Sequence, residues 1–239
     1  MRKRLAATIL GIASLSVTAC ATTEPELKDY TAFREEDPRS ILVLPALNNT
    51  VAVEAPEFFL STVSKPFALR GYYVFPANMT KSLLENEGLS DPSLIYSADT
   101  TRLGNLFGCD AALYLSIEKW ESQYAVIVTS TNVEFNYELR SCKTGEVLWQ
   151  DNRALSYSPQ SNSSGNLLAD MLAQALISAI EKGSPNYIPL AQQANAAAAS
   201  TTGKGIPAGP YLEEYYNKDL DMFPTQSSLS KSESATSSD

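Results

Sequence analysis

The chain has 239 residues, of which 44% are hydrophobic, and its 18 Lys and Arg against 27 Asp and Glu give a net charge of −9. This acidic balance argues against a nucleic-acid-binding protein, because such proteins attract phosphates with basic side chains. The chain contains no histidine, and this absence removes the commonest general base and metal ligand.

Residues 1–19 have the layout of a secretory signal peptide. Three basic residues at the start are followed by an uncharged run of apolar and small residues from Leu5 to Val17. This run is too short for a membrane span, which needs about 20 residues. It ends in the sequence VTAC, which resembles the lipobox of bacterial lipoproteins. The resemblance implies that the signal is cut before Cys20, and that Cys20 carries a diacylglycerol on its thiol and a fatty acid such as palmitate on its amine.

The residue after this cysteine is Ala21. By the sorting rule for such lipoproteins, Asp at this position retains the protein in the inner membrane. We therefore expect the outer membrane of a Gram-negative bacterium, with the protein lipid-anchored and facing the periplasm. Cleavage removes three of the 18 basic residues and no acidic one, so the net charge becomes 15 − 27 = −12. Residues 20–38 are polar and charged, which predicts a flexible tether behind the acylated cysteine.

The first half of the mature chain alternates strands and helices. Short apolar runs rich in β-formers predict buried strands at residues 40–46 and 72–76. Between them, residues 55–70 have the broad apolar face of a helix, with Gly71 as its natural end. This order predicts parallel strands joined by a right-handed crossover. Further helices are expected at residues 78–87 and 100–107.

The second half begins with a clear strand pattern. Residues 110–120 and 126–140 alternate apolar and polar side chains, and residues 146–157 return after a tight turn as a third strand. The pattern predicts an antiparallel meander with one face towards water or a partner. Residues 166–182 carry an apolar stripe that predicts a core helix. The alanine-rich stretch after Pro189 predicts a weakly packed helix.

Together these elements predict an α/β fold. We expect a single compact domain at residues 39–183, with a mixed sheet that has a βαβ start and an antiparallel three-strand meander, packed by amphipathic helices. Residues 184–223 are expected to form a C-terminal extension that packs on the domain. The serine-rich tail, residues 224–239, has too few apolar residues to fold and is predicted to be disordered.

Cys109 and Cys142 are expected at the same end of the sheet, one opening a strand and the other closing its neighbour. Two close thiols in an oxidising compartment usually pair. A regular hairpin with Leu113 opposite Phe135 would instead turn the two cysteines to opposite faces. The sequence therefore leaves a disulfide and two buried free thiols as alternatives. A catalytic cysteine is disfavoured, because no histidine exists to activate it.

Five segments resemble a family of bacterial lipoproteins of unknown function that includes a Neisseria surface antigen. They are PRSILVLPALNNT (38–50), GYYVFPANM (71–79), LFGCDAALYLSI (106–117), SCKTGEVLW (141–149) and GPYLEEYYNKD (209–219). The resemblance implies a compact domain similar to the N-terminal domain of TolB, and kinship with curli-secretion and penicillin-binding-protein-activator lipoproteins. These relatives are assembly and accessory factors, and the family has no established catalytic residues. The chain departs from the family pattern at Cys109 and Cys142 and in its serine-rich tail.

The sequence contains none of the common catalytic, phosphate-binding or dinucleotide-binding motifs, and we expect neither a cofactor nor a metal. The leading interpretation is an outer-membrane-anchored lipoprotein that acts without catalysis, as an accessory or assembly factor that contacts other envelope proteins. The candidate contact surfaces are the polar face of the sheet and the aromatic, acidic C-terminal segment with Tyr211, Tyr215, Tyr216 and Phe223. Aromatic residues are enriched at the centres of protein interfaces. An oligomer is also compatible with this interpretation.

Three alternatives stay open. The rings of the C-terminal segment, Tyr211 and Tyr215 above all, could dock on the protein's own domain. The protein could be an enzyme acting on the cell wall or on lipid, which a deep cleft lined by convergent carboxylates would indicate. It could also be an antigen or adhesin displayed on the cell surface. The carboxylates at residues 213, 214, 219 and 221 are interpreted as a solvated acidic segment, since their spacing lacks the pattern of a calcium-binding loop.

Overall fold

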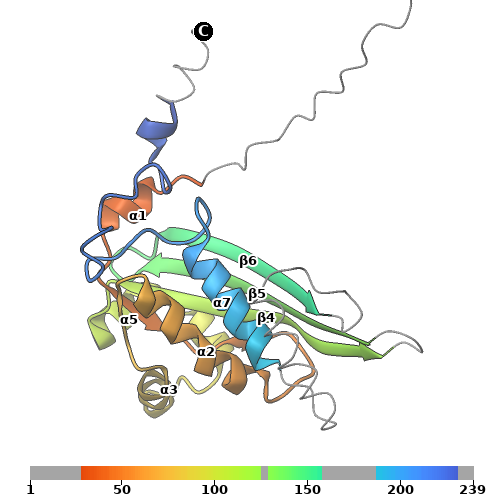
Figure 1. Ribbon diagram of the computed structural model, residues 1–239. Helices are drawn as coiled ribbons and strands as arrows, with labels where there is room; N and C mark the ends of the chain where they lie inside the picture. Colours follow the sequence, from red (N-terminus) through yellow and green to blue (C-terminus); the bar gives the residue numbers. More distant parts are fainter. Residues whose placement is uncertain (1–27, 125–128, 158–186, 231–239) are drawn as a thin grey trace, which may run out of the picture.

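The computed structural model describes residues 28–124, 129–157 and 187–230 (Figure 1). The signal peptide, Cys20, the helix expected at residues 166–182 and the last nine residues lie outside the described residues. Residues 226–230, at the start of the serine-rich tail, are helical. In the part of the chain that is described, no helix has both the length and the apolar character needed to cross a membrane.

A single mixed sheet forms the centre of the molecule, with the strand order β3-β1-β4-β5-β6 and with β2 paired to β4. β1 runs parallel to both β3 and β4, while β4, β5 and β6 are antiparallel. The predicted α/β fold with a βαβ start and a three-strand meander is therefore confirmed. The strands are β1 (Ser40–Val43), β2 (Leu47–Asn48), β3 (Tyr73–Val74), β4 (Ala111–Tyr124), β5 (Thr129–Ser141) and β6 (Val147–Tyr157).

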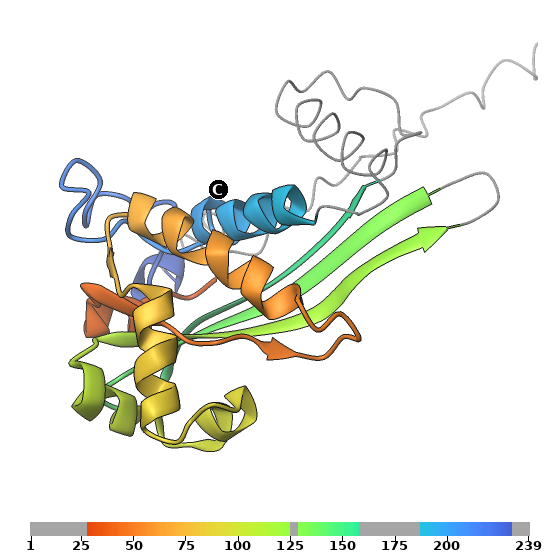
Figure 2. The ribbon, with the colours of Figure 1, turned by 90° about the horizontal axis from the view of Figure 1, so that it is seen from below.

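Helices cover both faces of this sheet (Figure 2). α2 and α7 lie side by side on one face and enclose the larger apolar core, while α3, α4 and α5 cover part of the opposite face around a smaller core. Sequence patterns predicted α2 and α5 closely, but α4, a short helix that begins at a proline, was not predicted. The helices are α1 (Thr31–Glu36), α2 (Ala55–Leu69), α3 (Ala77–Asn86), α4 (Pro92–Ser97), α5 (Thr100–Phe107) and α7 (Ile188–Ser200).

The prediction that the alanine-rich helix is weakly packed is wrong. α7 buries Ala191, Ala194 and Ala198 completely against the core, because small side chains let it approach α2 closely. Its Asn195 is also fully buried, accepting a hydrogen bond from the Tyr137 hydroxyl at 2.7 Å and donating one to the Thr62 hydroxyl at 2.8 Å. This chain of hydrogen bonds joins the sheet, α7 and α2.

The predicted flexible tether, residues 20–38, is also wrong for residues 28–38, which are part of the folded domain. α1 occupies residues 31–36, and Tyr30 and Phe33 are 1% and 3% exposed within the larger core. Tyr30 and Phe33 are spaced three residues apart, which places their side chains on one helix face. The charged residues around them made the stretch look like a polar tether. Described contacts begin at Lys28, whose backbone N–H donates to the Gly203 carbonyl at 3.4 Å.

The register of the β4–β5 hairpin differs from the regular one that we expected. Leu113 lies opposite Leu139 rather than Phe135, and a bulge shifts the register between Ile117 and Lys119. The expected register assumed shorter strands and an earlier turn. The observed register moves the start of β4 four residues further along β5, to Ser141, and so brings the two cysteines together.

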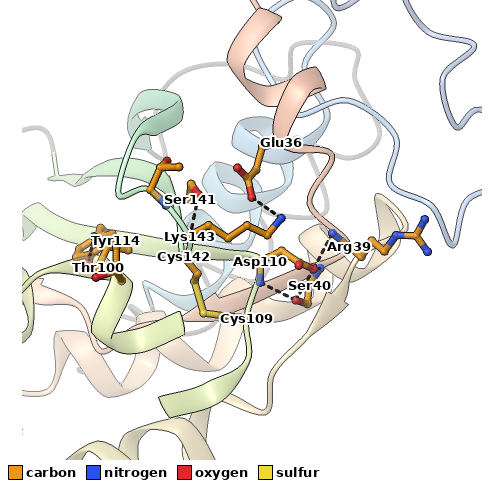
Figure 3. Close-up of a disulfide and its surroundings, with 12 residues drawn as sticks. Glu36, Arg39, Ser40, Thr100, Cys109, Asp110, Tyr114, Ser141, Cys142 and Lys143 are labelled. Atoms are coloured by element: carbon orange, nitrogen blue, oxygen red, sulfur yellow. Dashed lines mark hydrogen bonds and ion pairs between the residues drawn. A yellow bond between two sulfur atoms is a disulfide. The ribbon is translucent and has the colours of Figure 1, made fainter. Parts of the chain in front are cut away.

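Cys109 and Cys142 are joined by a disulfide, with their Cα atoms 6.0 Å apart (Figure 3). Both residues are buried in the smaller core. The disulfide ties the end of α5 to the turn between β5 and β6. Gly104 of α5 is required there, because a Cβ at this position would lie 2.4 Å from the Cys142 carbonyl oxygen.

Candidate interaction surface

The C-terminal segment, residues 206–223, runs along the end of α2 and the start of β3. The Gly209 N–H donates to the Arg70 carbonyl at 2.7 Å, and the Tyr211 N–H donates to the Gly71 carbonyl at 3.0 Å. The two glycines allow this close approach. A Cβ on Gly71 would lie 2.6 Å from the Leu212 Cβ, and one on Gly209 would lie 2.4 Å from the Gly71 oxygen.

A buried carboxylate fixes the segment from within. Asp219 is 1% exposed and lies 2.7 Å from the Arg34 guanidinium and 3.5 Å from that of Arg70. Its second oxygen, Oδ2, also accepts a hydrogen bond from the Ala208 N–H at 2.7 Å. The interpretation of this carboxylate as part of a solvated acidic segment is therefore wrong. Asp219 joins α1, α2 and the C-terminal segment, and the two arginines were not recognisable as its partners from sequence spacing.

Phe223, which we predicted as part of the contact surface, is buried instead. It is 2% exposed, packs edge-on against Tyr30 with ring centroids 5.2 Å apart, and lies under the Arg70 guanidinium at 5.4 Å. The tether prediction left Tyr30 out of the core, so no apolar partner for Phe223 was visible in the sequence. Phe223 therefore anchors the segment and is not available to a partner.

Tyr211 and Tyr215 project from the anchored segment into solvent. Tyr211 is 67% exposed and Tyr215 is 47% exposed, which corrects the alternative that these two rings dock on the protein's own domain. Tyr216 is intermediate, and its hydroxyl donates to the Asp37 carboxylate at 2.7 Å. This hydrogen bond raises the pKa of the Tyr216 phenol above its usual range. Of the four predicted aromatic contacts, the structure presents two to solvent, holds one at the boundary and buries one.

Acidic residues neighbour the exposed rings in the sequence. Glu213 and Glu214 are both exposed, as is Leu220 at 50%. We call these exposed residues of the C-terminal segment, Tyr211, Glu213, Glu214, Tyr215 and Leu220, the C-terminal platform. It combines apolar area, which gains from burial in a complex, with negative charge that selects a partner of opposite sign. Its backbone is held in place by the contacts of Gly71, Gly209 and Asp219.

The polar face of the sheet, the other predicted contact surface, forms a network within itself. Glu118 accepts hydrogen bonds from the Ser116 hydroxyl at 2.7 Å and from the Asn136 amide at 2.9 Å. These bonds lower the pKa of the Glu118 carboxyl. Glu134 pairs with Lys119 at 2.7 Å, and this hydrogen bond lowers the pKa of Glu134. The side chains of this face thus satisfy one another across β4 and β5.

In the part of the chain that is described, no group of three or more Cys, Asp or Glu side chains is placed to hold a metal ion. Apart from Asp219, which is neutralised by two arginines, the carboxylates of the C-terminal segment are exposed. Among the described tyrosines, burial raises the pKa of Tyr30, Tyr72, Tyr96 and Tyr137, so these phenols stay protonated and serve as hydrogen-bond donors.

Comparison with known proteins identifies similar chains. The model of the lipoprotein GNA1162-like family matches residues 28–211. A lipoprotein of Neisseria meningitidis serogroup B, NMB1124/NMB1162, is 31% identical over 173 residues, which span 72% of this chain and 78% of the relative. The crystal structure of lipoprotein GNA1162 from Neisseria meningitidis has a TM-score of 0.51 and 28% identity, and covers 61% of this chain and 99% of that one.

A more distant structure is the PelC dodecamer from Paraburkholderia phytofirmans, with a TM-score of 0.40 and 15% identity over 69% of this chain and 94% of that one. The family match ends at residue 211. Most of the C-terminal platform therefore lies beyond the part of the chain that the family model covers.

Proposed function

Because the chain belongs to the lipoprotein GNA1162-like family, we propose that it is an outer-membrane lipoprotein that acts without catalysis, by contacting other envelope proteins through the C-terminal platform. Its partner is a protein surface that combines apolar pockets with basic side chains. Its anchor is the acylated Cys20, and its folded part faces the periplasm.

The observation that carries the proposal is the exposure of Tyr211 and Tyr215 on an anchored backbone. Large rings in water gain free energy when a partner covers them, and they carry much of the binding energy in protein interfaces. Since Asp219 and Gly71 already hold the segment in place, binding costs little additional ordering of the backbone. A segment that served only to close the core would need Phe223 but not the exposed rings of Tyr211 and Tyr215.

The short connection to the anchor supports a role close to the membrane. Seven residues separate Cys20 from Lys28, where the described contacts begin. An extended chain spans at most about 3.3–3.6 Å per residue, so Lys28 can lie no further than about 30 Å from the lipidated residue. The domain is therefore held within reach of envelope proteins at the same membrane.

Two experiments test the anchor and the surface separately. For the anchor, Cys20→Ser should leave an uncleaved or soluble periplasmic form, and a variant that still fractionates with the outer membrane at the processed mass would refute lipidation. For the surface, a photo-crosslinking amino acid at position 211 should give adducts with envelope proteins in intact cells. The same amino acid at Gln192, exposed on α7, serves as the control.

The decisive comparison combines crosslinking at position 211 with Tyr215→Ser. This variant should reduce the adducts at least fivefold while leaving the unfolding temperature within about 1 °C, because the Tyr215 ring is 47% exposed and does not belong to either buried core cluster. Unchanged adducts, or equal adducts from positions 211 and 192, would exclude the C-terminal platform as the contact surface. Protease treatment of intact cells separates the periplasmic role from surface display, since only a displayed protein is cleaved.

A further inference from the structure

A crevice of about 370 Å³ opens beside β2, at a site that neither the C-terminal platform nor the disulfide involves. Its walls come from β2, the start of α2, α3 and the loop between α3 and α4. The floor is apolar, with Ala46, Leu60 and Leu89, and prolines at 45, 56 and 92 stiffen its sides. A rigid, largely apolar recess of this size accommodates a few side chains of a bound segment.

An open strand edge borders this crevice. Within the described residues β2 pairs with β4 and with no other strand. Pro45 interrupts the chain between β1 and β2, and β3 pairs only with β1, at Ser40 and Ile41, so no described strand lies beyond β2. The Asn49 N–H donates to the Ile117 carbonyl and the Leu47 N–H to the Tyr96 hydroxyl, so the outward backbone groups of β2 are those of Asn48. Leu47 and Asn48 line the crevice. The backbone groups on an unpaired strand edge are a template for an added strand.

The rim of the crevice is acidic. Lys81 is paired with Glu57, and within the described residues neither Glu85 nor Asp91 forms an ion pair. Glu85 is exposed, and Asp91 accepts a hydrogen bond from the Ser93 N–H at 2.9 Å, a contact that lowers the pKa of this carboxyl. The negative charge of this rim attracts basic side chains.

Apolar side chains project from a preorganised loop that directly follows β2. Asn48 accepts hydrogen bonds from the Thr50 N–H at 3.1 Å and the Thr50 hydroxyl at 2.8 Å, and it donates to the Ala52 carbonyl at 2.8 Å. The loop thus built presents Val51 at 98% exposure and Val53 at 86%. Two β-branched apolar residues held in solvent beside a strand edge extend the binding surface and need no ordering when a partner arrives.

We propose that this crevice binds an extended segment of a partner protein by strand addition to β2. The added segment alternates apolar side chains, which enter the crevice and contact Val51 and Val53, with basic side chains, which meet Glu85 and Asp91. Alternation follows from the period of two in a strand. The loop that carries the valines lies on the side of the molecule away from α1 (Figures 1 and 2), so the site stays open when the domain is tethered through its N-terminal side. The proposal does not depend on the C-terminal platform.

Short synthetic peptides test this site on the purified full chain in detergent. The probe is acetyl-Val-Lys-Val-Lys-Val-amide, and its counterpart with Glu in place of Lys tests the charge. A third peptide keeps the Lys sequence but carries N-methyl groups on alternate amides, which removes the strand hydrogen bonds. Binding is followed by amide chemical shifts of residues 46–53. The Lys peptide should bind at least tenfold more tightly than either of the other two.

Two variants locate the binding. Ser90→Trp fills the mouth of the crevice from an exposed position, and Glu85→Lys reverses the charge of the rim. Each should weaken the Lys peptide at least tenfold. The control is Glu87→Lys, the same charge reversal two residues away at an exposed position that does not line the crevice; it should change binding by less than twofold.

Failure of the Lys peptide to bind, or equal binding of its N-methylated form, would overturn strand addition at β2. Equal loss of binding with Glu85→Lys and Glu87→Lys would show attraction to the overall negative charge and would overturn the assigned site. None of these results bears on crosslinking at position 211, so this inference and the proposed function can fail independently.

Discussion

Arg34 and Asp219 form an ion pair of 2.7 Å although they are 185 positions apart in the chain. The pair joins the first described helix to the C-terminal segment, and the Asp219 side chain is only 1% exposed. Removing a buried carboxylate of this kind destabilises the fold, because the guanidinium groups of Arg34 and Arg70 then stay partly buried without a counter-charge.

We therefore predict that Asp219→Asn lowers the free energy of unfolding by about 3 kcal/mol, as expected when one partner of a buried ion pair is lost. Urea unfolding followed by circular dichroism measures the change. Asp221→Asn is the matched control, since Asp221 is exposed on the same segment and its replacement should shift the midpoint little. Equal midpoints for the two variants would show that the ion pair contributes nothing to stability.

This contact shows where sequence patterns stopped being informative. Period-two alternation and apolar runs predicted the sheet, because the residues that a strand buries can be recognised from its own local sequence. The partners of Asp219 lie on α1 and α2, far away in the chain, and no local pattern marks them. Tyr30 and Phe33 were missed for a related reason: charged neighbours surround them, and their apolar partners, Phe223 and Tyr72, come from other elements.

The cysteines illustrate the same limit at a smaller scale. Their placement at one end of the sheet could be predicted, but their pairing depended on a register that turn length and a bulge decide. The candidate surface was predicted in part. Composition identified Tyr211 and Tyr215, whereas the burial of Phe223 required the position of Tyr30. The crevice beside β2 could not be predicted from the sequence, because its walls come from β2, α2, α3 and the loop between α3 and α4, and their relative placement is a property of the folded chain.

The disulfide should contribute substantially to stability. Cys109 and Cys142 are 33 residues apart. In the chain-entropy model, closing a loop of this length lowers the entropy of the unfolded chain and so stabilises the folded state by about 4 kcal/mol. Reduction with dithiothreitol should therefore lower the unfolding midpoint, and mass spectrometry after alkylation should find both thiols blocked before reduction. The double variant Cys109→Ala with Cys142→Ala should be insensitive to dithiothreitol. A free thiol signal from the native chain would contradict the bond.

The polar sheet face should give the fold an acid-sensitive component. Hydrogen bonds from Ser116, Asn49 and Asn136 lower the pKa of Glu118 below its ordinary value of 4.5. A carboxyl with a depressed folded-state pKa contributes stability that is fully present above the unfolded value and is lost as the pH falls through the folded value. The difference in unfolding midpoint between the native chain and Glu118→Gln should thus shrink between pH 6 and pH 3. A difference that stays constant over this range would show that ionisation of Glu118 does not contribute.

The close packing of Gly71 gives the sharpest test of how the C-terminal platform is held. Gly71 has φ +87°, and a Cβ there would lie 2.6 Å from both the backbone nitrogen and the Cβ of Leu212. Gly71→Ala should therefore push the segment away from α2, lower the free energy of unfolding by about 2 kcal/mol or more, and speed hydrogen exchange of the Tyr211 amide, which donates to the Gly71 carbonyl.

Gly88→Ala separates backbone strain from this steric clash. Gly88 has a similar φ of +79°, but a Cβ there would meet no heavy atom within 4 Å. Its replacement should cost only the strain of a left-handed alanine, about 1–2 kcal/mol, and should leave exchange of the Tyr211 amide unchanged. If both variants lose the same stability and exchange at Tyr211 is equal, strain alone explains the effect and the contact with Leu212 does not hold the platform. Faster exchange only in Gly71→Ala, together with fewer adducts from position 211, would link the glycine to presentation of the two tyrosines.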